Sequence, residues 1–206
     1  MPVTPSKIVC VGRNYREHAA ELGNDVPSAP LLFLKPPTAV IQDGEAIVMP
    51  RASARVDHEG EIGVVIGKKL KHASPDEARG AIAGIVAAND VTARDLQTID
   101  GQWSRAKGLD TFCPVGPLGK PPADLSSMEL VTRVNGKVRQ SAKSSEMVFG
   151  IPEILSYASG VMTLMPGDLV LTGTPSGISP LAAGDVVEVE IVGVSKVRSP
   201  VVAERA

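Results

Sequence analysis

The chain has 206 residues, of which 43% are hydrophobic and 21% are charged, and its formal net charge is -2. This is the composition of a soluble globular protein, and it offers no basic surface for nucleic acid. No stretch approaches the roughly 18 consecutive apolar residues of a membrane span, and the start of the chain lacks a signal-peptide pattern. We therefore expect a single cytoplasmic domain over residues 1–206, with no membrane partner and no nucleic-acid partner.

The first quarter of the chain predicts short strands around one short helix. Tyr15, Ala19 and Leu22 lie at helical spacing, which predicts a helix at about 13–24. Isolated helices below about 12 residues rarely hold in water, so this helix is a candidate mobile segment. Extended segments are predicted over residues 7–12, 30–41 and 45–50.

The rest of the chain is predicted to be mainly β-structure. A second short helix is predicted with Ser74 as its N-cap, Pro75 at the first helical position and Glu77 completing a capping box. Asn135-Gly136 is the pair suited to a type I′ hairpin turn. Further elements are predicted over 82–97 (a buried strand that turns polar at Asn89-Asp90), 129–140 (the hairpin), 151–160 (a helix), 167–174 and 184–194 (β-rich runs). Strands without regular strand-helix alternation predict a mostly β roll or sandwich.

Residues 56–63, VDHEGEIG, place two carboxylates in a segment that otherwise predicts a buried strand. Successive side chains of a strand point to opposite faces, so Asp57, Glu59 and Glu61 share one face. Two ionised carboxylates about 6.6 Å apart along a strand repel each other unless a hard cation such as Mg²⁺ or Mn²⁺ lies between them. Asp90 is the best third ligand, ahead of Asp95 and Asp57. The alternative is a set of solvated charges on the wet face of an edge strand.

Other residues suggest catalysis or anion binding, each with a simpler alternative. His18 and Glu21 lie at i and i+3, a spacing that suits a general base oriented by a carboxylate, or two residues of a solvated helix face. Lys107 and Arg94 are either counter-charges for an anionic substrate or solvated loop residues. Residues 172–177, TGTPSG, are either a carboxylate-binding turn or an ordinary one. Cys10 and Cys113 match no metal or redox spacing and are expected to be buried thiols.

Five motifs in this order resemble the fumarylacetoacetate hydrolase family, most of all its small acylpyruvate hydrolase and oxaloacetate decarboxylase branch. They are GRNYREHAAELG (12–23), DHEGEIG (57–63), ANDVTARDLQ (88–97), KGLDTFCPVGP (107–117) and GDLVLTGTPSG (167–177). The resemblance covers residues 8 to about 194. It implies a mixed β-sandwich roll, a homodimer, and a Mg²⁺ or Mn²⁺ site at the mouth of the roll.

The resemblance also implies roles for individual residues. The metal ligands would be Glu59, Glu61 and Asp90. His18 and Glu21 would form a catalytic dyad on a lid helix, and the catalytic and substrate contacts would include Arg94, Gln97, Lys107 and Thr174. Some family members have a further acidic ligand seven residues before the histidine, where this chain has Val11.

The implied function is metal-dependent cleavage of a C–C bond in a 2-oxo acid. The reaction would be acylpyruvate hydrolysis or oxaloacetate decarboxylation, both through a metal-stabilised pyruvate enolate, with His18 as the base that activates water. The enzyme alternative is an isomerase or decarboxylase of an unsaturated dicarboxylic acid such as 2-hydroxyhepta-2,4-diene-1,7-dioate. In that case Arg13, Arg16 or Arg105 would contact the second carboxylate. A non-catalytic metal-binding protein is the third hypothesis.

Overall fold

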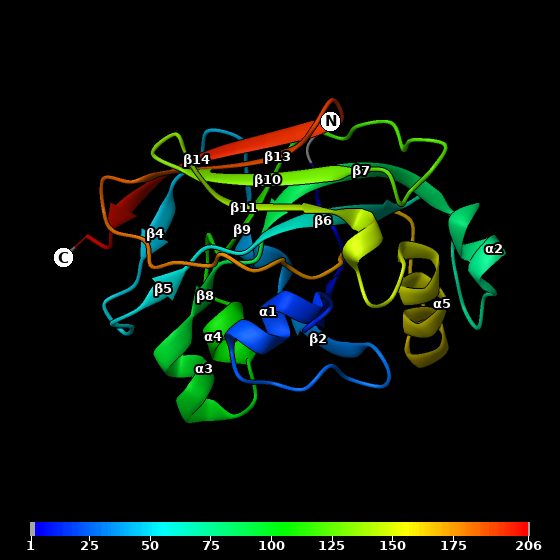
Figure 1. Cartoon of the computed structure of the whole chain (residues 1–206), viewed down its shortest axis with the longest axis horizontal. Coiled ribbons are helices and arrows are strands. Elements are labelled where there is room, and N and C mark those ends of the chain that lie inside the picture. The colour runs from blue at the N-terminus through cyan, green and yellow to red at the C-terminus, as the bar shows by residue number, and fades with distance from the viewer. Residues whose placement is uncertain (1–2, 206) are drawn as a thin grey trace.

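Two β-sheets pack against each other and form most of the structure (Figure 1). The computed structural model describes residues 3–205. Within these residues the larger sheet has seven strands in the order β2-β1-β12-β6-β7-β9-β3, and the smaller has five in the order β11-β10-β13-β14-β4. A separate pair joins β5 to β8. The mostly β architecture predicted from the sequence is confirmed.

The larger sheet is mixed, because β1 runs parallel to β12 and β3 runs parallel to β9 while the other neighbours are antiparallel. Its strands are β1 (Ile8–Gly12), β2 (Leu31–Lys35), β3 (Val40–Gln42), β6 (Gly60–Ile66), β7 (Ile82–Asn89), β9 (Cys113–Val115) and β12 (Leu169–Leu171). The antiparallel register of β6 and β7 sets Gly60 opposite Asn89, so the start of one strand meets the end of the other.

The smaller sheet contains the predicted hairpin. Its strands are β4 (Ile47–Met49), β10 (Glu129–Val134), β11 (Lys137–Lys143), β13 (Val186–Ile191) and β14 (Ser195–Ala203). Asn135 and Gly136 connect β10 to β11 with φ values of 52° and 76°, as a type I′ turn requires. The separate pair consists of β5 (Val56–Asp57) and β8 (Thr92–Ala93).

The helices are short and lie at the edges of the sheets (Figure 1). They are α1 (Arg16–Glu21), α2 (Pro75–Arg79), α3 (Arg94–Asp100), α4 (Ser104–Lys107) and α5 (Ile151–Val161), with single 3₁₀ turns at Pro37–Ala39 and Ser144–Glu146. The capping box of α2 forms as predicted, with Ser74 accepting from the Glu77 amide and the Glu77 carboxylate accepting from the Ser74 amide. None of the helices in residues 3–205 is long and apolar enough to span a membrane.

Three sequence predictions differ from the structure. The helix expected at about 13–24 forms only over Arg16–Glu21, because Arg13 has a positive φ and Tyr15 is extended. The strand expected around residues 56–63 is interrupted, so β5 and β6 are separate. Helices α3 and α4 were missed, because neither starts with a capping side chain or a proline of the kind that marks α2.

The buried side chains of β6 alternate as predicted. Ile62, Val64 and Ile66 pack into the core shared by the two sheets, while Glu61 lies on the opposite face. β1 alternates in the same way: Val9 faces the shared core and Cys10 faces a smaller apolar cluster on the other side of the large sheet. Glu61 is therefore held on a fully buried strand whose direction is set by packing on both faces.

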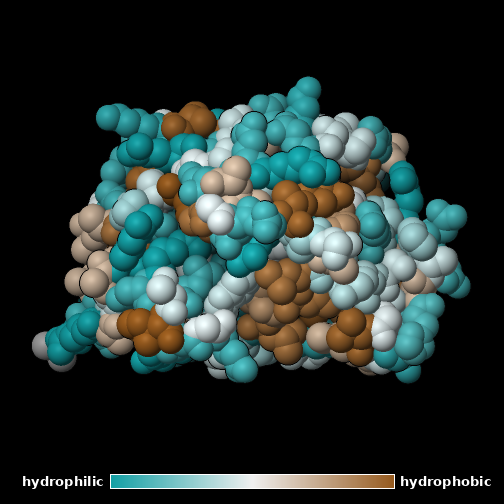
Figure 2. Space-filling model, turned by 60° about the horizontal axis from the view of Figure 1, so that its bottom comes forward, coloured by the Kyte–Doolittle hydropathy of each residue, from teal (hydrophilic) through white to brown (hydrophobic). Residues whose placement is uncertain are grey.

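The outer edge of the large sheet is apolar. Within residues 3–205, β2 pairs only with β1, and Leu31 and Leu34 on it are exposed, as is Leu22 just after α1. Figure 2 shows a broad hydrophobic area on the face that includes this edge, beside hydrophilic surface. An apolar edge strand of this kind is a surface on which another chain can pair.

Candidate active site and metal centre

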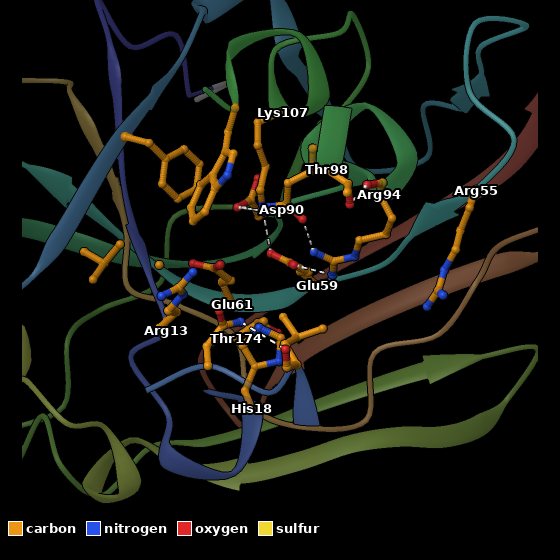
Figure 3. Close-up of a pocket in the computed structure, with 17 residues that line it drawn as sticks. Arg13, His18, Arg55, Glu59, Glu61, Asp90, Arg94, Thr98, Lys107 and Thr174 are labelled. Carbon is orange, nitrogen blue, oxygen red and sulfur yellow. Dashed lines mark hydrogen bonds and ion pairs between the residues drawn. The ribbon is translucent and has the colours of Figure 1, made fainter. Parts of the chain in front are cut away.

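A cavity of about 350 Å³ lies between the large sheet, the segment around α1, and helices α3 and α4 (Figure 3). Seven charged side chains and His18 line it. The charged residues are Arg13, Arg55, Glu59, Glu61, Asp90, Arg94 and Lys107. Gln97, Thr174, Phe33 and Trp103 also face it. The cavity brings together all of the predicted site residues except Glu21, which contacts His18 from the helix.

The carboxylates of Glu59, Glu61 and Asp90 converge in this cavity, each with an oxygen within 4.8 Å of the others. All three are buried. Backbone bonds hold the cluster together, since the Asp90 amide donates to the Glu59 carbonyl at 2.8 Å and the Glu59 amide donates to the Asn89 side chain at 2.9 Å. Gly60 is required between the glutamates, because a Cβ there would lie 1.9 Å from the Thr132 hydroxyl.

Three cationic side chains contact these carboxylates. The Lys107 ammonium donates to Glu59 at 2.7 Å and to Asp90 at 2.6 Å. Arg94 donates to Glu59 and, at 3.0 Å, to the buried carboxylate of Asp57. Lys35 donates to the other oxygen of Asp90 at 2.6 Å. The predicted counter-charges are therefore ion-paired within the site, and neither Lys107 nor Arg94 is a solvated loop residue.

The electrostatic environment separates the two glutamates. Burial strongly raises the pKa of Glu61, and the negative charges of Asp90 and Glu59 raise it further. Burial also acts to raise the pKa of Glu59, but Arg94 and Lys107 outweigh it and leave this pKa well below its usual range. Burial acts to lower the pKa of Lys107, and the charges of Asp90 and Glu59 reverse that effect and raise it.

Glu61 is the carboxylate that lacks a cationic partner among the described residues. One of its oxygens accepts from the Gly173 amide at 2.7 Å, and it forms no ion pair. A buried carboxylate beside two others is costly unless a cation compensates it. The all-oxygen donor set is the one that Mg²⁺ and Mn²⁺ prefer, so these three residues fit a divalent ion. Val11 lines the same cavity and supplies no fourth carboxylate.

His18 faces the carboxylates from helix α1 (Figure 3). Its Nδ1 lies 3.2 Å from a Glu21 carboxylate oxygen. The other Glu21 oxygen accepts from the Gly177 amide at 3.0 Å, and Glu17 accepts from the Ser176 hydroxyl at 3.1 Å. The turn at 172–177 therefore docks helix α1 and orients its dyad, and its Gly173 and Gly177 amides bind protein carboxylates.

The remaining predicted residues have defined partners. Gln97 accepts from Arg94 at 3.0 Å, and the Thr174 hydroxyl donates to the Gly60 carbonyl at 2.8 Å. Asp57 binds Arg55 and Arg94, and Asp95 binds Ser53, so neither belongs to the carboxylate cluster. Cys10 and Cys113 are buried; burial raises the pKa of both thiols, to about 12 for Cys113.

Lys35 is the clearest residue that sequence reasoning missed. Its side chain is fully buried, and its ammonium also donates to the Val91 carbonyl at 3.3 Å. The available signal was a lone lysine at the end of the otherwise apolar strand LLFLK. Because Lys35 and Lys107 each bind one oxygen of Asp90, together they fix the orientation of that carboxylate.

Replacing Lys35 with methionine should destabilise the protein by about 3 to 5 kcal/mol, the range for removing one partner of a buried ion pair. The control is Lys196→Met, because Lys196 is half exposed and its pair with Glu188 contributes less than about 1 kcal/mol. Urea unfolding in the presence of a chelator measures the stability of both variants without a contribution from bound metal. Equal midpoints for the two variants would contradict a stabilising role of Lys35.

The chain is similar to proteins of known sequence and structure. Residues 7–202 match the family described as fumarylacetoacetate (FAA) hydrolase C-terminal. The mitochondrial oxaloacetate decarboxylase of Dictyostelium discoideum is 43% identical over 197 residues, covering 92% of this chain and 89% of that protein. A mitochondrial oxaloacetate tautomerase of Arabidopsis thaliana is 41% identical, covering 94% of this chain and 89% of that protein.

A solved structure extends the similarity to the fold. The 5-carboxymethyl-2-hydroxymuconate delta-isomerase from Mycobacterium smegmatis superposes with a TM-score of 0.92 at 44% identity, covering 100% of this chain and 82% of that one. The family match spans nearly all of the described chain, including every residue of the carboxylate cluster. This chain therefore belongs to the fumarylacetoacetate hydrolase family, whose members are enzymes acting on small molecules.

Proposed function

We propose that this protein is a Mg²⁺-dependent enzyme, with Mn²⁺ as the alternative ion, that cleaves a C–C bond in 2-oxo acids. The observation that carries the proposal is the convergence of Glu59, Glu61 and Asp90 in one cavity that His18 also faces. Oxaloacetate decarboxylation is the leading reaction, supported by the relatives named for oxaloacetate, and acylpyruvate hydrolysis is the companion reaction. Both reactions would leave the same pyruvate enolate.

The chain supplies binding and charge for this chemistry. Glu59, Glu61 and Asp90 would hold the ion, which would act as a Lewis acid toward the 2-oxo and carboxylate oxygens of the substrate and stabilise enolate charge. Lys107 and Arg94, already at the edge of the carboxylate cluster, would retain the anionic substrate. Gln97, bonded to Arg94, would hold that guanidinium in position.

His18 would be the proton-transfer residue. Glu21 would orient the imidazole through Nδ1, leaving Nε2 for a water molecule or the substrate. In acylpyruvate hydrolysis that nitrogen would take a proton from the attacking water. In decarboxylation no water attacks, so the position of helix α1 over the cavity would decide between the two reactions.

A second candidate is isomerisation of an unsaturated dicarboxylic acid such as 2-hydroxyhepta-2,4-diene-1,7-dioate. Two observations favour it: the similarity to the mycobacterial delta-isomerase, and the presence in the cavity of Arg13, whose side chain forms no ion pair with the described residues. Of the other arginines, Arg16 is exposed outside this cavity, and Arg105 pairs with Asp100 on the surface.

The test is turnover of oxaloacetate and acetylpyruvate by purified protein, with Mg²⁺ or with excess chelator. We expect Mg²⁺-dependent pyruvate release from oxaloacetate, measured by a coupled lactate dehydrogenase assay, because keto-enol exchange alone changes absorbance but releases no pyruvate. Acetylpyruvate is followed by its ultraviolet absorbance. If folded, Mg²⁺-binding protein converts neither compound, the C–C cleavage proposal is wrong and the dienoate is the next substrate.

The homodimer implied by the family remains a prediction. The exposed apolar edge of β2, with Leu31 and Leu34, is the surface that best suits pairing with a second copy.

A further inference from the structure

Arg13 is the cavity arginine that forms no hydrogen bond or ion pair through its side chain with another residue of the described chain. Arg55 differs, because its guanidinium binds both oxygens of the buried Asp57 at 3.0 Å. Arg94 is likewise held by Asp57 and Glu59. In Figure 3 Arg13 and Arg55 lie on opposite sides of the carboxylate cluster, with Arg13 on the side of Glu61. One guanidinium in the cavity is therefore free to bind a ligand.

The backbone at Arg13 is held in an unfavourable conformation. Its φ is 57°, in the left-handed region that non-glycine residues rarely adopt. The next residue explains why it persists: the Asn14 side chain donates to the carbonyls of Thr172 (2.8 Å) and Phe149 (3.1 Å) and accepts from the Phe149 amide (2.9 Å). Such strain is maintained by surrounding structure and is concentrated at ligand-binding positions.

The packing beneath this segment is also tight. A Cβ on Gly173 would lie 2.7 Å from the Cβ of Asn14, so the segment that carries Arg13 approaches the 172–177 turn as closely as two backbones allow. The same turn docks helix α1 through Gly177 and Glu21. The position of Arg13 is therefore linked structurally to that of the dyad five residues later.

The charge of the cavity leaves room for a dianion. Three carboxylates and four cationic side chains line it, and behind them the buried Lys35 and Asp57 carry opposite charges. The formal charge of the cavity is therefore about +1, and a divalent ion would raise it to about +3. A monoanionic 2-oxo acid would leave about +2, and a dianion about +1. A cavity with excess positive charge favours the more negative ligand.

We propose that Arg13 binds the second carboxylate of a dicarboxylic 2-oxo acid and thereby selects dianionic over monoanionic substrates. This rests on the proposed function and narrows its substrate class. The guanidinium is a planar donor that matches a carboxylate in two-bond geometry. With the 2-oxo acid end at the carboxylate cluster and the second carboxylate at Arg13, the substrate would occupy the cavity that His18 also lines.

The experiment compares the binding of two ligands that differ only by a terminal carboxylate, 2-oxoglutarate and 2-oxopentanoate, to Mg²⁺-loaded protein. Trp103 is the only tryptophan of the chain and lines the cavity, so its fluorescence reports binding without turnover. We expect the parent to bind the dianion at least about tenfold more tightly. Arg13→Gln should lose this preference and keep its affinity for the monoanion within about twofold.

Three further variants separate recognition from structure. Arg13→Gly tolerates the positive φ without a guanidinium and should behave like Arg13→Gln. Arg13→Lys keeps the charge and should recover part of the preference. Arg16→Gln, on an exposed position outside the cavity, should match the parent. The proposal would be overturned if Arg13→Gln weakened the binding of both ligands equally, or if the parent did not bind the dianion more tightly than the monoanion.

A kinetic arm distinguishes failure of this inference from failure of the proposed function. Arg13→Gln should raise KM for oxaloacetate about tenfold or more and change KM for acetylpyruvate, whose distal group is neutral, by less than twofold. If the parent turns over neither compound but its dianion preference depends on Arg13, the substrate contact stands and the C–C cleavage proposal fails. If the parent turns over both compounds and Arg13→Gln shifts both KM values equally, the C–C cleavage proposal stands and the proposed contact of Arg13 with the second carboxylate fails.

Discussion

Replacing His18 with asparagine is expected to lower kcat for the Mg²⁺-dependent reaction by about 100-fold to 10,000-fold, the range for loss of a positioned acid or base. The imidazole faces the carboxylate cluster and is oriented by Glu21, which in turn is held by the Gly177 amide. Asparagine keeps a polar side chain of similar reach but cannot take up a proton at neutral pH. Initial rates at saturating substrate and Mg²⁺ measure the effect.

The control for this variant is His72→Asn. His72 is exposed, lies outside the cavity and has a φ of 51°, which asparagine tolerates. The control should retain parental kcat, and both variants should show the parent's Mg²⁺ affinity. Full activity of the His18→Asn variant would contradict the proposed role of His18 as the base. If the parent binds Mg²⁺ but converts neither oxaloacetate, acetylpyruvate nor the dienoate, the hypothesis of a non-catalytic metal-binding protein becomes the leading one.

Replacing Glu61 with glutamine should abolish Mg²⁺ binding and raise the stability of the metal-free protein. Burial and the neighbouring carboxylates raise the pKa of Glu61 in the folded chain. The folded state therefore prefers the protonated group, and this contribution to stability is present at low pH and is lost as pH rises through the folded pKa. A permanently neutral glutamine removes the resulting penalty at neutral pH, worth about 1.4 kcal/mol for each unit of pKa shift.

Two thermal melts of each protein test this prediction by measuring its stability, one with chelator and one with Mg²⁺ at about 100 times its dissociation constant. The parent should gain about 2.7 kcal/mol from Mg²⁺, and Glu61→Gln should gain nothing. Glu153→Gln, an exposed position in the first turn of α5, is the control and should respond to Mg²⁺ like the parent. A Glu61→Gln protein that is still stabilised by Mg²⁺ would place the ion elsewhere.

Local features of the chain were predictable wherever neighbouring residues decide them. The Asn135-Gly136 turn and the Ser74 capping box form as expected, because both are determined within a few residues. Helix α1 was overextended in the prediction, because the hydrogen bonds of Asn14 to Phe149 and Thr172, contacts remote in sequence, hold the residues before it outside a helix. Helices α3 and α4 were missed because neither starts with a capping side chain or a proline.

By itself the sequence determined that Glu61 lies on the face of its strand opposite Ile62, since side-chain alternation is a property of the extended backbone. Its motifs also identified the family. The structure brings Asp90 to the two glutamates, as its motif predicted, but only the tertiary structure decided that Lys35 is buried against this cluster and that the Arg13 side chain has no partner among the described residues. These outcomes depend on which strands pair and in which register, which joins residues far apart in the chain and leaves no local pattern.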